Sequence, residues 1–325
     1  MDFRTIIHNP VSAIQIDHTT RMMLFGSCFS ENIGRKLQYY KFRLDLNPFG
    51  ILYNPFSISA AIRRLLGAES FSEADLVSCN GIFHSLMHHG QFSSSDKDTC
   101  LRNISDRFEC AAGNIRQTDL FLITFGSAYV YQWKESGVIV GNCHKFPSNM
   151  FHRFRLSVGE VIEEWSEIIT ALKAVQPKIQ LLFTVSPVRH WKEGVHENQL
   201  SKSVLHLAID KLQHLFPDNV YYFPAYEVMI DDLRDYRFYE NDMIHPSSVA
   251  IDYIWQLFGK TFFSDHTMKI NEEWEQIRKA LDHRPIYPGT NAHNKFMKDT
   301  RRKLNEFILK FPEISCDETN TSMCQ

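Results

Sequence analysis

The chain has 325 residues, of which 44% are hydrophobic and 22% charged, the composition of a globular protein that can bury a full core. Its formal net charge of -3 and the lack of a long basic block argue against nucleic acid as the main partner. No run approaches the roughly 18 apolar residues that a membrane span needs, so we expect no membrane contact.

The first twenty residues are polar, are broken by Pro10 and contain no apolar core of a signal peptide, so we expect the cytoplasm. The seven cysteines include no C-x-x-C pair, which argues against a zinc ribbon or a redox dithiol. We expect most of them to be small buried apolar groups.

Short apolar runs bounded by turn residues predict buried strands, and most are separated by segments with helical spacing. This alternation predicts an α/β fold, a three-layer α/β/α sandwich with a mainly parallel sheet and crossover helices. The predicted strands are 22–25, 120–125, 179–185 and 220–223, and the predicted helices are 31–40, 158–175, 198–216 and 248–263.

One main domain is expected over residues 1–265. Within it, the segment around 70–115 is rich in Ser, His and Asp and lacks clean periodicity, which indicates an insertion or a lid over the end of the sheet. Residues 266–325 are expected to form a helical C-terminal extension with a polar tail at 315–325.

Candidate functional residues follow three of the predicted strands. Gly26-Ser27-Cys28 follows the first strand, Gly126-Ser127 the second, and Arg189-His190 lies just after the third. Because ligands of open α/β sheets bind outside the carboxyl ends of the strands, we expect these turns to meet in space.

Late in the chain, YENDMIHPSS places Asp242 three residues before His245. A carboxylate at this spacing can hold one imidazole nitrogen and leave the other free as a base, which is half of a nucleophilic triad. The third member would be Ser27 or Cys28, at a helix N-terminus whose N–H groups can stabilise an oxyanion. An isolated D-x-x-H often occurs by chance, so the order of the motifs is the stronger signal.

Residues 26–30, GSCFS, closely resemble the motif that names the GSCFA family, bacterial proteins placed among the SGNH/GDSL hydrolases. The resemblance covers residues 20 to 260 and implies a flavodoxin-like fold and esterase-type acyl chemistry that needs no cofactor. The other stretches that carry it are NPFGILYNP, TFGSAYVYQW, GNCHKFP, TVSPVRH and NDMIHPS.

SGNH enzymes carry Gly-Asp-Ser, then a glycine, then Gly-x-Asn, then Asp-x-x-His. Asp242 and His245 match the last block, and Gly50 matches the second. The third block departs from the pattern, because Gly126-Ser127-Ala128 stands where the oxyanion asparagine is expected. Its substitute would be one of three residues, Asn54, Asn142 or the hydroxyl of Ser127.

Set against Gly-Asp-Ser without a gap, Gly26-Ser27-Cys28 places the thiol at the position of the nucleophile. A thiolate beside an imidazole and a helix N-terminus is a strong nucleophile, so this register favours Cys28. A shift of one residue in the turn would place Ser27 at the position of the nucleophile instead. The structural alternative makes Cys28 a packed thiol and Ser27 only a helix cap.

HSLMHHG supplies three histidines, including His84, but no acidic or cysteine partner at ligand spacing, so we expect no metal site. Contact with substrate from a lid, or a solvated loop, fits it better. His144 and Arg189 lie near predicted strand ends and could bind a substrate carboxylate or phosphate. Arg189 could equally pair with a neighbouring acid.

The favoured hypothesis is a hydrolase or acyltransferase that acts on the acyl ester of a small molecule or carbohydrate, such as an acetylated sugar. Cys28 or Ser27 attacks, His245 moves the proton, Asp242 orients His245, and N–H groups near residues 28 and 50 hold the oxyanion. Two alternatives stay open: a non-catalytic carbohydrate- or ligand-binding module on the same fold, and a cysteine-dependent thioesterase.

Overall fold

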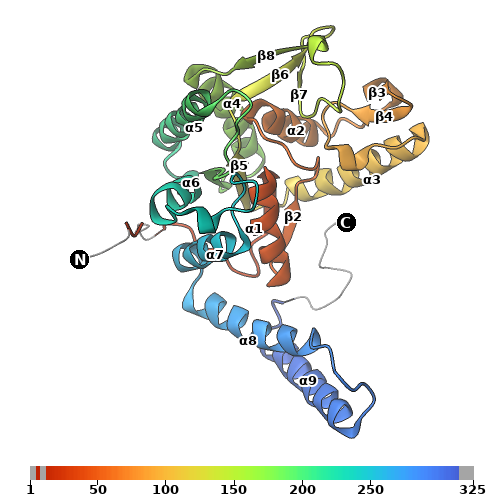
Figure 1. The fold of residues 1–325 in the computed structure, drawn as a ribbon, viewed down its shortest axis with the longest axis vertical. Helices are drawn as coiled ribbons and strands as arrows, with labels where there is room; N and C mark the ends of the chain where they lie inside the picture. The colour runs from red at the N-terminus through yellow and green to blue at the C-terminus, as the bar shows by residue number, and fades with distance from the viewer. Residues whose placement is uncertain (1–4, 8–11, 315–325) are drawn as a thin grey trace.

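Five parallel strands form the central sheet of the computed structural model, which describes residues 5–7 and 12–314 (Figure 1). Their order β10-β9-β5-β1-β2 is that of flavodoxin-like folds, so the predicted α/β class is confirmed. The predicted tail at 315–325 lies outside the described residues. The strands are β1 (Met22–Gly26), β2 (Leu44–Leu46), β5 (Leu120–Phe125), β9 (Gln180–Val185) and β10 (Val220–Tyr222).

All four predicted strands are confirmed to within one residue at each end. The sequence missed β2, because it is three residues long and has Asp45 at its centre. That carboxylate is buried and paired with Arg107 of α3 (Lys97–Ile115), so its charge is compensated by a residue far away in the sequence.

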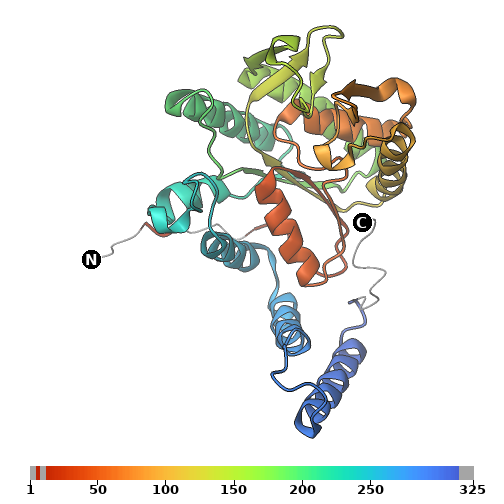
Figure 2. The same cartoon turned by 45° about the vertical axis from the view of Figure 1, so that its right-hand side comes forward.

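Helices cover both faces of the sheet and give three layers (Figure 2). Along β1, Met22 and Leu24 pack on the side of α1 (Cys28–Tyr39) and α7 (Ser248–Phe262), whereas Met23 and Phe25 pack on the opposite side. That side is covered by α2 (Pro55–Gly67), α3, α4 (Val158–Val175) and α5 (Val195–Leu215). The short α6 (Ala225–Glu227) follows β10.

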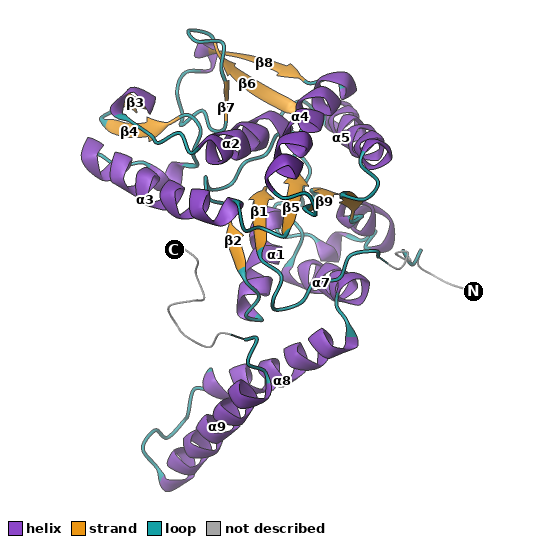
Figure 3. Cartoon of the chain, turned by 180° about the vertical axis from the view of Figure 1, so that it is seen from behind, coloured by secondary structure: helices purple, strands orange, loops and turns teal. Residues whose placement is uncertain are grey.

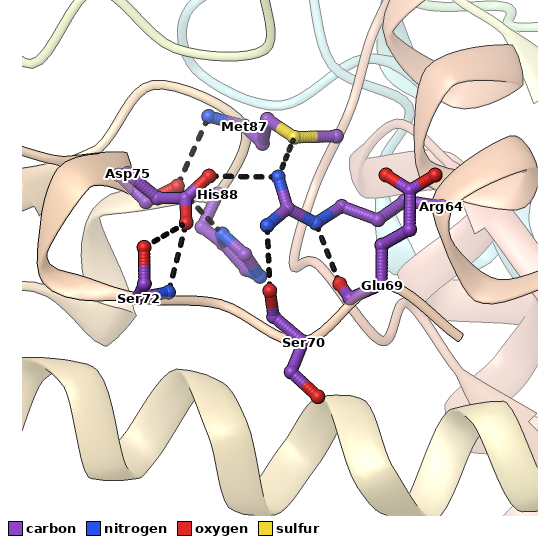
Figure 4. Close-up of polar contacts among 8 residues, drawn as sticks. Arg64, Glu69, Ser70, Ser72, Asp75, Met87 and His88 are labelled. Carbon is purple, nitrogen blue, oxygen red and sulfur yellow. Dashed lines mark hydrogen bonds and ion pairs between the residues drawn. The ribbon is translucent and has the colours of Figure 1, made fainter. Parts of the chain in front are cut away.

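The segment predicted as an insertion or lid carries α3 and the hairpin of β3 (Leu76–Cys79) and β4 (Ile82–Ser85). Figure 4 shows how Arg64 of α2 anchors it: the guanidinium bonds Asp75 at 2.8 Å and donates to the carbonyls of Glu69 and Ser70. The same group stacks on the ring of Phe71 at 3.6 Å. The segment is therefore packed firmly against α2.

A second, antiparallel sheet stands apart from the central one (Figure 3). Its order is β7-β6-β8, with β6 (Tyr129–Trp133), β7 (Ile139–Val140) and β8 (Phe151–Arg155) inserted between β5 and α4. The sequence analysis did not predict it, because its short strands lack a continuous apolar run.

The predicted C-terminal extension consists of α8 (Asp265–Leu281) and α9 (Asn291–Lys310), which project from the body as a helical pair (Figure 1). Trp274 fixes the pair to the main domain, because its indole N–H donates to the carbonyl of Tyr39 at 2.6 Å. Within the described ranges, no helix is both long and apolar enough to cross a membrane.

Gly26 ends β1 in a backbone conformation, φ +150°, that side chains rarely adopt, and an added Cβ would lie 2.6 Å from both Cβ and O of Thr124 on β5. We expect Gly26→Ala to lower the free energy of unfolding by about 2–4 kcal/mol, because backbone strain and overpacking add. Urea denaturation followed by circular dichroism measures this.

The matched control is Gly81→Ala, at φ +76° with no atom within 4 Å of the added Cβ. It carries backbone strain alone and should cost about 1 kcal/mol. Equal losses in the two variants would mean that the contact with Thr124 does not restrict residue 26.

Candidate active site

A cavity of about 520 Å³ lies where the turns after β1, β5 and β9 meet. This confirms that the three predicted turns are close in space. The antiparallel sheet supplies another wall, and no lining residue falls between 70 and 115, so the segment predicted as a lid does not contribute. The candidate site residues that line it are Ser27, Cys28, Asn54, Ser127, Asn142, Arg189 and His245.

Ser27 is the N-cap of α1, since its Oγ accepts the N–H of Phe29 at 3.3 Å. The same Oγ donates to the hydroxyl of Ser186 at 3.1 Å, and the residue is 1% exposed. The hydroxyl is thus buried and engaged on both sides, which leaves little freedom to attack a substrate.

Cys28 is the first residue of α1, is partly exposed and carries a free thiol. Burial raises the pKa of the thiol, while N–H groups at the start of the helix and the charge of Lys202 oppose the rise. A thiol with this pKa is mainly protonated at neutral pH and needs a base to become a nucleophile.

Asp242 and His245 form the expected pair. The imidazole Nδ1–H donates to Asp242 Oδ2 at 2.6 Å, and Oδ1 accepts the N–H groups of His245 at 3.0 Å and Ile244 at 2.9 Å. These hydrogen bonds, the backbone one from His245 first, lower the pKa of Asp242 to about 2. Nε2 of His245 has no hydrogen-bond partner in the part of the chain that the structure describes, so it is open to act as a base.

Gly50 does not supply the oxyanion N–H that the sequence analysis assigned to it. It lies outside the cavity, and its N–H donates to the carbonyl of Asn47 at 2.7 Å. Its backbone has φ +74° and approaches His89, since an added Cβ would lie 2.3 Å from the Cβ of that histidine. The glycine therefore serves a tight turn against the 70–115 segment.

The segment Gly126-Ser127-Ala128, which replaces the expected Gly-x-Asn, also has its N–H groups hydrogen-bonded within the protein. The N–H groups of Gly126 and Ser127 both donate to the carbonyl of Tyr53, at 2.7 and 3.0 Å. The Ser127 hydroxyl accepts the N–H of Tyr129 at 3.0 Å and lies 3.3 Å from the hydroxyl of Ser201. Only the Ser127 hydroxyl proton could be offered to a ligand.

The two candidate asparagines differ in what their amides do. Asn54 caps α2, with Oδ1 accepting the N–H of Ser57 and Nδ2 donating to its hydroxyl, both at 2.8 Å. Asn142 accepts the N–H of His144 through Oδ1 at 2.9 Å, and among the described residues its Nδ2 has no acceptor. Asn142 is therefore the better placed donor for an oxyanion in the cavity.

His84 and His144 stack on each other at 4.4 Å and lie outside the cavity lining. His84 bonds the hydroxyl of Ser93 at 2.7 Å, and His144 bonds the carbonyl of Ser85 at 2.8 Å. Burial lowers the pKa of both rings. The described ranges contain no group of three or more His, Cys, Asp or Glu that could hold a metal ion.

Arg189 lines the cavity and stacks on Trp191 at 5.0 Å. Among the described residues no carboxylate pairs with it, in contrast to Arg153, which pairs with Glu193. The cavity also carries aromatic side chains on several sides, namely Tyr53, Tyr129, Tyr131 and Trp191.

Lys202 of α5 was not among the candidate residues predicted from the sequence. It is fully buried. Its ammonium donates to the carbonyls of Gly126 and Ser186, both at 2.7 Å. A signal was present in the sequence, because Lys202 lies on the buried stripe with Leu205 and Ile209, where a charge is unexpected.

We predict that His245 carries its proton on Nδ1 at pH 9, since that nitrogen faces a carboxylate that remains ionised there. In Asp242→Asn the amide can donate to Nδ1 instead, so the proton should move to Nε2. Nitrogen NMR of histidine-labelled protein distinguishes the two tautomers, with His245→Gln assigning the signal. The same tautomer in wild type and Asp242→Asn would contradict the pairing.

The solved structures that resemble this chain include two distant neighbours. One is a Bacteroides fragilis protein provisionally described as an acylhydrolase, with 10% identity, a TM-score of 0.38, and coverage of 80% of this chain and 91% of the other. The second is a carbohydrate esterase of family 3 from Talaromyces cellulolyticus, with 8% identity, a TM-score of 0.34, and coverage of 78% and 99%. At these TM-scores neither neighbour assigns a function.

No curated protein matches the chain. Two family models do match it. The model of the GSCFA family covers residues 21–258, which include every candidate site residue, and the model of the C-terminal domain of GSCFA domain proteins covers residues 274–321. The chain belongs to the GSCFA family.

Proposed function

We propose that this protein is an ester hydrolase or acyltransferase of the SGNH type with Cys28 as its nucleophile. The observation that carries the proposal is one cavity lined by a half-buried thiol at a helix N-terminus and by a carboxylate-held imidazole. Ser27 is set aside as the nucleophile because its hydroxyl caps the helix and bonds Ser186.

In the proposed reaction, Nε2 of His245 takes the proton of Cys28 as the sulfur attacks the acyl carbon. The carbonyl oxygen becomes an oxyanion, which accepts hydrogen bonds from the N–H of Cys28 and from Nδ2 of Asn142. His245 then gives the proton to the leaving alcohol, and the acyl group remains on the sulfur. Water, or a second alcohol, then attacks this thioester and gives its proton to His245. The carbon–sulfur bond breaks, the acid or new ester leaves, and His245 returns the proton to the sulfur of Cys28.

The lining of the cavity supports a carbohydrate ester as substrate. Aromatic faces such as Trp191 and Tyr53 can pack against the apolar faces of a sugar ring. Arg189, which has no carboxylate partner in the described ranges, can bind a carboxylate or phosphate on that sugar through paired N–H groups. We therefore propose an acylated sugar that carries a negative group.

A thioesterase remains the second candidate, because a thiol nucleophile can exchange acyl groups with a thioester. The discriminating measurement is the ratio of kcat/KM for an acetyl thioester to that for the matching oxygen ester. A ratio far above that of the uncatalysed reactions would favour the thioesterase.

We expect Cys28→Ala and His245→Ala each to lower kcat for 4-nitrophenyl acetate by about 10³–10⁴-fold, because both act in the same step. Ser27→Ala should keep most of the turnover and lose about 1 kcal/mol of stability, the usual cost of a lost N-cap. Peptide mapping after iodoacetamide and after a fluorophosphonate probe identifies the reactive residue. Wild-type turnover in Cys28→Ala, or a fluorophosphonate adduct on Ser27, would reject Cys28.

Asn142→Ala should lower kcat by about 10²–10³-fold, the usual loss for one oxyanion donor, with little change in KM. Asn54→Ala is the matched control, since it removes a helix cap and should lower the melting temperature instead. A larger loss of kcat in Asn54→Ala than in Asn142→Ala would transfer the oxyanion role to Asn54.

A further inference from the structure

A lysine without exposed surface lies beneath the turn that carries Cys28. The Nζ of Lys202 donates to the carbonyl oxygens of Gly126 and Ser186 at 2.7 Å and lies 5.6 Å from the ring centroid of Tyr226. No carboxylate pairs with it in the ranges that the structure describes. Its positive charge is thus held by peptide dipoles and an aromatic face alone.

Burial of an ammonium group without a carboxylate is unfavourable by several kcal/mol. If Lys202 only linked two carbonyls, a neutral amide donor could do the same at lower cost. A negative charge that forms nearby would offset this cost.

The two carbonyls connect Lys202 to the nucleophile turn. Gly126 follows β5 and Ser186 follows β9, and the hydroxyl of Ser186 accepts from Ser27, the cap of the helix that Cys28 begins. Lys202 therefore fixes two strand ends and, through Ser186, the residue next to the thiol.

The charges around Lys202 come from several elements. Burial and then the charge of Arg189, in the loop after β9, lower the pKa of Lys202 to about 7, whereas Cys28 acts in the opposite direction. His190, from the same loop, has its pKa lowered to about 4 by burial and by the charge of Lys202, so it is neutral at pH 7. The uncharged ring that faces Lys202 is that of Tyr226, which belongs to α6.

We propose that Lys202 is a positioning residue whose buried positive charge stabilises the thiolate form of Cys28. This inference rests on the proposed role of Cys28. A thiolate that forms on proton transfer to His245 is stabilised by the nearby charge of Lys202. The coupling is reciprocal, so a charged Cys28 also favours the charged form of Lys202.

The test is the rate of alkylation of Cys28 by iodoacetamide from pH 5.5 to 9.5, measured by peptide mass spectrometry. In Lys202→Met and Lys202→Gln the rate below pH 7, where Lys202 carries its proton, should fall by about 10-fold, and the difference from wild type should shrink as the pH rises and Lys202 becomes neutral. Lys202→Arg keeps a charge and should not lower the rate. Cys143, which lines the same cavity, is the internal control, and its alkylation should not change.

A wild-type alkylation rate at Cys28 below pH 7 in the neutral variants overturns the proposal, even if their melting temperatures fall. If neither neutral variant folds, lysine side-chain NMR of wild type and Cys28→Ala decides. The midpoint of Lys202 should be lower in Cys28→Ala, and equal midpoints reject the coupling. Alkylation needs no substrate, so a folded wild-type protein that hydrolyses no ester contradicts the proposed function without affecting this result.

Discussion

The close pairing of β1 with β5 is the constraint on which the candidate site depends. Residue 26 approaches Thr124 so tightly that only glycine fits, and the chain turns there into α1. This sets Ser27 below the turn, where it caps the helix and bonds Ser186, and leaves Cys28 at the cavity wall. A looser pairing would separate the turns whose residues form the cavity.

Several backbone groups near this turn are already hydrogen-bonded within the protein. Tyr53 accepts the N–H groups of Gly126 and Ser127, and Lys202 bonds the carbonyls of Gly126 and Ser186. These bonds join the turns after β5 and β9 to each other and to Tyr53, and the N–H groups of Gly126 and Ser127 are already used. The N–H at the start of α1 and the amide of Asn142 are the donors best placed for a ligand.

Charge is distributed unevenly around the cavity. Arg189 lines it without a carboxylate partner in the described ranges, and Lys202 lies beneath it with peptide carbonyls as its partners. Both carboxylate oxygens of Asp242 accept hydrogen bonds, one from the imidazole of His245 and the other from backbone N–H groups. Arg189, Lys202 and the carboxylate-held imidazole of His245 together favour an anion in or beside the cavity, such as a thiolate, an oxyanion or a negative group on the substrate.

The sequence by itself determined four of the five strands of the main sheet, the helices α1, α4, α5 and α7, and the D-x-x-H pair, because hydrophobic period and local spacing specify them. It did not predict β2, α2 or α3. It could not decide between Ser27 and Cys28, since one residue of register in a turn depends on how β1 meets β5. Nor could it place Gly50, choose Asn142 among the candidate donors, or bring out Lys202. These distinctions depend on which polar groups are already paired, and such pairing joins residues far apart in the sequence, such as Gly126 and Lys202, 76 positions apart, which only the tertiary fold brings together.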